Sequence, residues 1–398
     1  MTSKIFTGDM PEIMENILNN LNNEFNSLYS CALVNRHWCK MSIPILWQDP
    51  FSFSFVRTPL FISGYFSSLC EDEKSSLKNY GIDAEHSKTL FEYARYLKVL
   101  DLYSLEKVKI LMPVGSINDA LMNLIINLLF KLFIESGATL DKLVVYFPDY
   151  LILKPEIFCS LGQNEQFFSR LRYLSLSEVA FSSIESATTL LRTLAKNATK
   201  IRALKLEEFG SVYEHYEPQL FHALFHAIIQ IIKSQEQLRL FSLIGVNCLS
   251  EFYGIISALE SQKNSLQEVI IDNCDFTTEF EILKYCKNLE TLRIKYCDMK
   301  LLKILSYKIN TLEVVGVQSD GSIIAQILEM SGILLKRLKL DSRISVREES
   351  SILEALKSFC PNITYLDISR IGFSAHLLEL YKNFSNSHYG ALLTYQKN

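Results

Sequence analysis

The sequence predicts an α/β solenoid, with parallel strands on the concave face and helices on the convex face, preceded by a short helical segment. Three observations support this prediction. The pattern apolar-x-x-apolar-x-apolar occurs ten times between residues 97 and 368. Apolar runs at helical spacing separate several copies, and residues before 50 carry helical periodicity alone. A length of 398 residues accommodates one long array of this kind.

The N-terminal helical segment is predicted to begin near Asp9. Asp9 and Glu12 have the spacing of a helix cap, and Pro11 is tolerated in a first helical turn. Apolar residues then follow at helical spacing: Ile13, Ile17, Leu18 and Leu21. A second helical stretch starts near Ser27 and runs towards Trp38. A segment of about forty residues buries little apolar surface by itself, so it should need a partner.

Residues 9 to 50 resemble an F-box, whose pattern opens on Leu-Pro, passes through Ile-Leu and Val-x-x-x-Trp, and closes on Leu-Trp. The matching positions are Met10-Pro11, Ile17-Leu18, Val34 to Trp38, and Leu46-Trp47. Methionine replaces the usual leucine at the opening and keeps an apolar contact. The resemblance implies a three-helix hook that docks the Skp adaptor of cullin-RING ubiquitin ligases. Seven residues are implied to bind the adaptor or support the hook: Pro11, Ile17, Leu18, Val34, Trp38, Leu46 and Trp47.

An alternative role for this segment is a cap, because the open end of a solenoid needs a cover. Both tryptophans of the chain, Trp38 and Trp47, fall within it. Buried tryptophans are typical anchors of interfaces, whereas a simple cap needs neither, and this favours docking. The expected domain organisation is an F-box over residues 1–50, a linker over 51–90 and repeats over 91–398.

Each repeat is predicted to begin with a short strand. The ten copies of the motif start at Leu97, Leu140, Leu171, Ile201, Leu238, Leu266, Leu289, Ile309, Leu335 and Ile363. Because strand side chains alternate between faces, Leu292 and Ile294 should point inwards, and Thr291, Arg293 and Lys295 outwards. The interval of 43 residues after Leu97 leaves room for an insertion or a degenerate repeat.

The repeats resemble the cysteine-containing class of leucine-rich repeats over about 300 residues of the chain. Cys274 and Cys297 each lie eight residues after the first leucine of their repeat, where the motif carries Asn or Cys. A zinc site that also uses Cys286 is disfavoured, because spacings of 12 and 11 residues match no zinc pattern. We therefore expect these thiols to be structural.

The outward residues of the strands are candidates for binding a target protein. They balance acidic and basic types, whereas a surface that tracks a nucleic-acid backbone is predominantly basic, so nucleic acid is excluded as a partner. A local basic group in the later repeats fits an acidic or phosphorylated segment. A solvated sheet face without that role is the alternative. The target-binding candidates are Tyr173, Arg293, Lys295, Arg337 and Lys339, with Tyr103, Tyr146 and Tyr365 as further aromatic anchors.

No catalytic, cofactor or metal site is predicted. His222 and His226 have metal-sharing spacing, but Ala223 replaces the glutamate of the metalloprotease motif, which favours a packing role. Gly316 to Gly321 has phosphate-loop spacing but lacks the lysine. Nine cysteines without paired motifs, and no N-terminal secretory pattern, favour reduced thiols in the cytoplasm or nucleus. The apolar run from Leu121 to Ile134 carries a polar stripe and is expected to be an amphipathic helix, not a membrane span.

The expected function is therefore the substrate-recognition subunit of a Skp–cullin–F-box ubiquitin ligase. Its partners would be the Skp adaptor, cullin through that adaptor, and a target protein held by the repeats. One alternative is a ligase-independent binding scaffold or inhibitor. A second is a GTPase-activating repeat protein, which would need an exposed catalytic arginine or similar group on a loop.

Overall fold

The computed structural model describes most of the chain in two compact units. The first comprises residues 1–174 with 179–199, and the second comprises 175–178 with 200–398, so the division passes through one strand. The described residues are 11–22, 24–52, 58–84, 89–106, 119–209, 218–249, 252, 254–304, 308–316, 321–341, 346–369 and 392–394.

Three helices open the first unit: α2 (Pro11–Asn19), α3 (Phe25–Ala32) and α4 (Arg36–Leu46). Met14, Leu18 and Leu28 are almost completely buried between them. Asn35 caps α4, because its Oδ1 accepts hydrogen bonds from the backbone N–H of His37 and of Trp38, both at 2.9 Å. The predicted helical periodicity of this segment is therefore present. The predicted cap residue Asp9 lies outside the described residues.

The stretch predicted to be a linker contains helices: α5 (Thr58–Phe66), α6 (Glu71–Lys78) and the 3₁₀ helix η1 (Tyr93–Tyr96). Helix α5 forms because apolar side chains at helical spacing become buried: Phe61, Ile62, Tyr65 and Phe66 are all at most 4% exposed. Tyr65 lies edge-on to Phe133 of the following repeat, with ring centroids 4.9 Å apart. Much of residues 51–90 therefore packs as part of the first unit.

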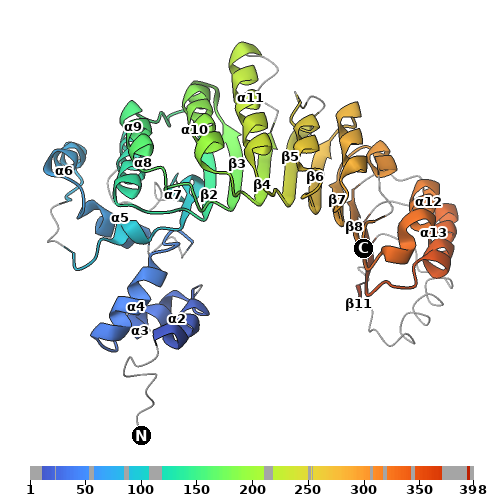
Figure 1. Ribbon diagram of the computed structural model, residues 1–398, viewed down its shortest axis with the longest axis horizontal. Coiled ribbons are helices and arrows are strands. Elements are labelled where there is room, and N and C mark those ends of the chain that lie inside the picture. The colour runs from blue at the N-terminus through green and yellow to red at the C-terminus, as the bar shows by residue number, and fades with distance from the viewer. Residues whose placement is uncertain are drawn as a thin grey trace, which may run out of the picture. The chain divides into compact units, whose positions relative to one another are not determined.

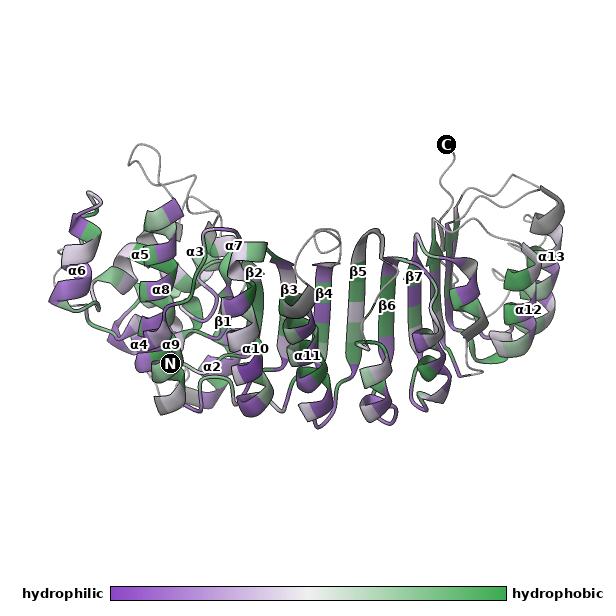
Figure 2. Cartoon of the chain, turned by 90° about the horizontal axis from the view of Figure 1, so that it is seen from above, coloured by the Kyte–Doolittle hydropathy of each residue, from purple (hydrophilic) through white to green (hydrophobic). Residues whose placement is uncertain are grey.

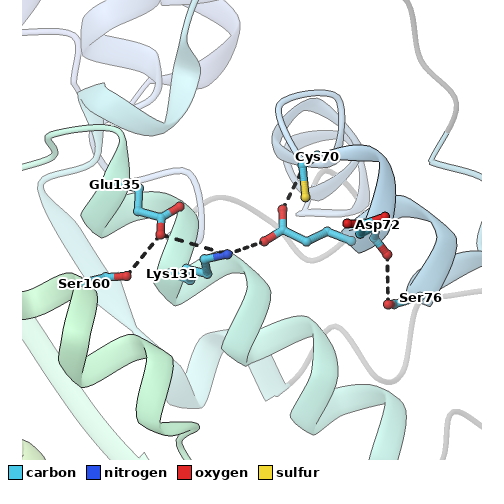
Figure 3. Close-up of polar contacts among 7 residues, drawn as sticks. Cys70, Asp72, Ser76, Lys131, Glu135 and Ser160 are labelled. Carbon is cyan, nitrogen blue, oxygen red and sulfur yellow. Dashed lines mark hydrogen bonds and ion pairs between the residues drawn. The ribbon is translucent and has the colours of Figure 1, made fainter.

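A polar network joins α6 to the helix of the first repeat, α8 (Asp119–Glu135). Lys131 Nζ lies 2.9 Å from Glu73 Oε1 and 4.0 Å from Glu135 Oε1, and the Ser160 hydroxyl donates to Glu135 (Figure 3). Burial raises the pKa of Glu73, but hydrogen bonds from Lys131 and Cys70 outweigh it and leave that pKa below its usual value. Lys131 belongs to the polar stripe predicted from the sequence.

The repeat helices of the first unit lie along one side of its strands (Figure 1). The strands are β1 (Val99–Asp101), β2 (Lys142–Phe147) and β3 (Tyr173–Val179). The helices are α7 (Leu102–Glu106), α8, α9 (Pro155–Gln163), η3 (Phe181–Ser183) and α10 (Ile184–Asn197). β1 and β2 pair in parallel, with Val99 opposite Lys142. Among the described residues, no helix has the length and apolarity needed to cross a membrane.

The second unit continues the same pattern. Its strands are β4 (Ala203–Phe209), β5 (Leu240–Leu249), β6 (Glu268–Cys274), β7 (Thr291–Lys295), β8 (Thr311–Val315), β9 (Arg337–Asp341), β10 (Tyr365–Ser369) and β11 (Leu392–Thr394). Its helices are α11 (Pro218–Ser234), η5 (Ser257–Gln262), η6 (Thr278–Tyr285), η7 (Met299–Ile304), α12 (Gly321–Ser331), η8 (Gly332–Leu334) and α13 (Val346–Phe359). Consecutive strands from β4 to β11 pair in parallel.

The ten predicted strands are confirmed. Each of β1 to β10 begins two residues after the first apolar residue of its motif, while β11 was not predicted. The predicted inward and outward faces are also confirmed in β7, where Leu292 and Ile294 are buried and Thr291, Arg293 and Lys295 are partly exposed. Figure 2 shows this alternation as bands of hydrophobic and hydrophilic residues across the strands. Residues 97–369 thus contain leucine-rich repeats.

Within each unit, backbone carbonyls tie consecutive repeats together. Lys336 O, for example, accepts from both Thr364 N and Tyr365 N, and Asn310 O accepts from Lys336 N and Arg337 N. Buried amide side chains add to this at the helix-to-strand junctions. Gln262, 3% exposed, accepts from Leu238 N at 3.1 Å and donates to the carbonyls of Ile232 and Gln235.

Candidate protein-binding surfaces

The seven predicted adaptor-binding residues divide by exposure. Ile17 and Val34 are 47% and 59% exposed, so they offer apolar surface to a partner. Leu18, Leu46 and Trp47 are at most 7% exposed and hold the segment together instead. Trp38 is partly exposed. Pro11 begins α2, and nothing is described of its side chain.

Trp47 is the centre of an aromatic cluster. Its indole stacks on Tyr93 with centroids 3.9 Å apart, and it meets Phe61 and Tyr65 edge-on at 4.8 and 5.0 Å. A Cβ on Gly64 would lie 2.5 Å from the indole, so glycine is needed for α5 to approach this closely. Trp47 therefore packs the N-terminal helices against α5 and η1, and it is no direct contact for a partner.

The residue after Trp47 caps the first strand of the repeats. Gln48 O accepts from Lys98 N at 2.9 Å and from Val99 N at 3.0 Å. This is the same two-donor arrangement by which Lys98 O receives the backbone N–H groups of Asp141 and Lys142 in the next repeat. The capping role considered from the sequence is therefore present at the end of α4.

The outer surface of the N-terminal helices nevertheless remains apolar. Five large apolar side chains there are 44–69% exposed: Ile13, Ile17, Tyr29, Leu33 and Val34. Ile13 and Ile17 are four residues apart and share one stripe of α2. Ile13 and Leu33 lie outside the quoted motif positions, so the resemblance alone did not single them out. The signal for Ile13 was its spacing of four residues from Ile17.

The predicted basic group of the later repeats forms ion pairs with acidic residues of neighbouring strands. Arg293, Glu313, Lys339 and Asp367 lie in register on β7 to β10. Arg293 Nη1 lies 3.3 Å from Glu313 Oε2, and Lys339 Nζ lies 3.4 Å from Asp367 Oδ2. Burial lowers the pKa of Lys339, but the charge and hydrogen bond of Asp367 outweigh it, so that pKa is raised. This row alternates in sign and presents no concentrated positive charge.

The other members of the basic group are also engaged. Lys295 Nζ lies 3.5 Å from Glu313 Oε1. Arg293 Nε lies 3.0 Å from Glu268 Oε1 and forms an ion pair with it, although the two atoms do not have the geometry of a hydrogen bond. Arg337 stacks on Tyr365, with its guanidinium 4.4 Å from the ring centroid. Among the five predicted target-binding residues, Arg293, Lys295 and Lys339 therefore balance carboxylates beside them, and Arg337 packs against an aromatic ring.

Tyr173 lies on β3 of the first unit, beside a lysine of β2. The ammonium of Lys142 sits 5.0 Å from the centre of the Tyr173 ring. Tyr146 on β2 meets Tyr103 edge-on, with centroids 5.3 Å apart, and Tyr103 is 45% exposed. The outward tyrosines of the first repeats therefore form a partly exposed aromatic surface.

The three cysteines of the disfavoured zinc site, Cys274, Cys286 and Cys297, are at least partly buried, as expected of structural thiols. Cys274 and Cys297 lie at equivalent repeat positions, and Cys274 N donates to Cys297 Sγ at 3.4 Å. Burial raises the pKa of Cys297 to about 12 and that of Cys286 to about 11. Searched among the described residues, His, Cys, Asp and Glu form no group able to hold a metal ion. His222 and His226 are exposed on α11, so the expected packing role is wrong for them.

No family model matches the sequence. The DNA repair protein rhp7 of Schizosaccharomyces pombe is 30% identical over 97 residues, which cover 23% of this chain and 17% of that protein. An internalin of Listeria monocytogenes has a TM-score of 0.38 and 16% identity, over 82% of this chain and 94% of that one. That score does not establish a shared fold, and the leucine-rich repeats rest on the strand register described above.

Proposed function

We propose that this chain is the substrate-recognition subunit of a Skp–cullin–F-box ubiquitin ligase. The N-terminal helices bind the Skp adaptor, and the repeats hold a target protein. The observation that carries the proposal is the exposed apolar surface of the N-terminal helices, with Ile17 and Val34 at positions of the F-box pattern. Exposed apolar clusters of this kind mark protein interfaces.

Capping and docking use different residues in this proposal. Trp47 and Gln48 connect the helices to the first repeat, whereas Ile17, Leu33 and Val34 are exposed. A segment that both caps and docks fixes the adaptor relative to the first repeats. The repeats would then hold a target lysine near the ubiquitin-bearing enzyme, which raises its effective concentration without any catalytic residue in this chain.

Binding of the full chain to purified Skp adaptor tests the proposal. The variant Ile17→Asp with Val34→Asp places charge on the proposed interface, and both side chains are exposed, so the fold should persist. We expect a loss of at least ~2 kcal/mol, or about thirtyfold in affinity. The matched control is Ile152→Asp, a side chain 53% exposed in the loop between β2 and α9.

Two results would contradict the docking proposal. One is failure of the unaltered chain to bind the adaptor, and the other is unchanged binding by the double variant. In either case the ligase-independent binding scaffold would be the better description, because the leucine-rich repeats do not depend on the adaptor.

A further inference from the structure

Tyr296 stands out among the residues that follow the strands of the second unit. It comes directly after β7, has a backbone φ of 52°, and keeps 58% of its surface exposed. Its N–H donates to Val315 O at 2.8 Å, which ties it to the neighbouring strand. A left-handed conformation is uncommon for a residue as bulky as tyrosine, and strain of this kind is concentrated at functional sites.

The neighbouring repeats show how unusual tyrosine is here. The equivalent positions, each five residues after the start of the strand, carry Glu208 with φ 55°, Asn273 with φ 53° and Gly316 with φ 66°. The repeat geometry therefore demands this conformation, which asparagine and glycine adopt readily, whereas tyrosine, like glutamate, adopts it at a cost in energy.

Gly316 also makes room for the ring. A Cβ at Gly316 would overlap ring carbons Cδ1 and Cε1 of Tyr296, so the ring lies flat across the glycine of the next repeat. The ring is therefore held in one place before any partner arrives. A fixed, amphipathic aromatic side chain binds with little loss of conformational entropy.

The surroundings of this ring are acidic. Among the described residues, four carboxylates lie near the carboxyl ends of β6, β7 and β9: Asp272, Asp275, Asp298 and Asp341. Two described lysines, Lys295 and Lys300, share this edge, which leaves two negative charges in excess among the residues that the structure describes. Lys295 is paired with Glu313 and Lys300 with Asp298. The local field therefore favours a cation.

We propose that the edge of β6 to β9 around Tyr296 binds an arginine-bearing segment of a protein partner. The guanidinium would stack on the exposed ring while the carboxylates of Asp272 and Asp341 balance its charge. This deepens the proposed function and rests on it, because the partner would be the target held by the repeats. It also replaces the acidic segment expected from Arg293 and its neighbours, whose charges are balanced by acidic residues within the sheet.

Fluorescence anisotropy of a labelled peptide with the full chain tests this inference. The probe is an octapeptide of alternating arginine and glycine, compared with peptides that carry glutamate or citrulline in place of arginine. Citrulline keeps the planar shape without the charge. We expect binding of the arginine peptide only, weakening as salt is added.

Tyr296→Asn removes the ring and retains a residue that tolerates the backbone conformation. We expect it to weaken binding about threefold to tenfold, while Tyr296→Phe retains it. The control is Tyr285→Asn, a tyrosine 64% exposed at the end of η6. Asp272→Asn should also weaken binding and reduce its salt dependence.

Equal binding of the arginine and glutamate peptides would overturn the inference, as would equal losses in the Tyr296 and Tyr285 variants. Because adaptor is absent from this assay, its failure leaves the docking proposal standing. Conversely, failure of adaptor binding with retained selectivity for the arginine peptide would leave a target-binding scaffold.

Discussion

The buried amide of Gln262 provides a direct test of how the repeats are held together. Its Oε1 accepts from Leu238 N, and its Nε2 donates to Ile232 O at 3.0 Å and Gln235 O at 2.9 Å. Gln262→Met keeps the approximate shape and removes all of these bonds. Ile232 O retains a second donor, Gln235 N at 3.4 Å, so the main cost comes from the orphaned N–H of Leu238 and the carbonyl of Gln235.

Each of the two buried groups left without a partner costs roughly 1–3 kcal/mol, so Gln262→Met should lower the free energy of unfolding by about 2–6 kcal/mol. With a urea dependence of about 2 kcal/mol per molar, the midpoint followed by far-ultraviolet circular dichroism should fall by about 1–3 M. Hydrogen exchange at the Leu238 amide should also accelerate. The control is Gln267→Met, because that side chain is exposed.

Both tryptophans belong to the first unit, whereas Gln262 belongs to the second, so tryptophan fluorescence follows the unfolding of the first unit separately. A decrease of less than about 1 kcal/mol in the free energy of unfolding would refute the reasoning, since a buried N–H that loses its acceptor costs more than that. It would equally be refuted by an unchanged rate of exchange at Leu238.

Gly316→Ala should lower the free energy of unfolding in urea by at least about 1 kcal/mol, because the φ of 66° disfavours alanine and the new Cβ meets the Tyr296 ring. Adding Tyr296→Ala removes that ring and should recover part of the loss. Raising the pH from 8 to 10 should destabilise the second unit. Burial raises the pKa of Cys297 to about 12, whereas the thiol of the unfolded chain ionises near ~8.5. Above a pH of about 8.5 the free energy of unfolding should therefore fall by about 1.4 kcal/mol per pH unit. Cys297→Ser should make the melting temperature depend less on pH. Glu73→Gln should lower stability by about 1 kcal/mol at pH 7, because the ion pair with Lys131 is only partly exposed. Hydrogen bonds from Lys131 and Cys70 lower the pKa of Glu73, so the difference should shrink in urea unfolding as the pH falls from the unfolded value of about 4.3 through that lowered pKa.

The positions of the ten predicted strands followed from the sequence because their signal is local and repeated. An alternation of apolar and polar residues assigns the faces of a strand. Each motif alone is weak, but ten copies in succession indicate a stack of parallel strands. For the same reason, helical spacing in the first 50 residues was enough to predict helices there. The packing of α5 and η1 was not predicted, since Phe61 and Tyr65 contact Trp47 and Phe133, which lie 14 to 68 residues away along the chain.

The sequence by itself determined where the repeats begin, which side chains form their core and which face outwards, because each of these depends on spacing of two to four residues. Tertiary structure alone decided which apolar residues of the N-terminal helices remain exposed and which, like Trp47, serve packing. It also decided that Arg293 and Lys339 lie beside carboxylates of adjacent strands. Neighbours across a sheet are separated by whole repeats, and the charge that a partner meets is the sum over all of them.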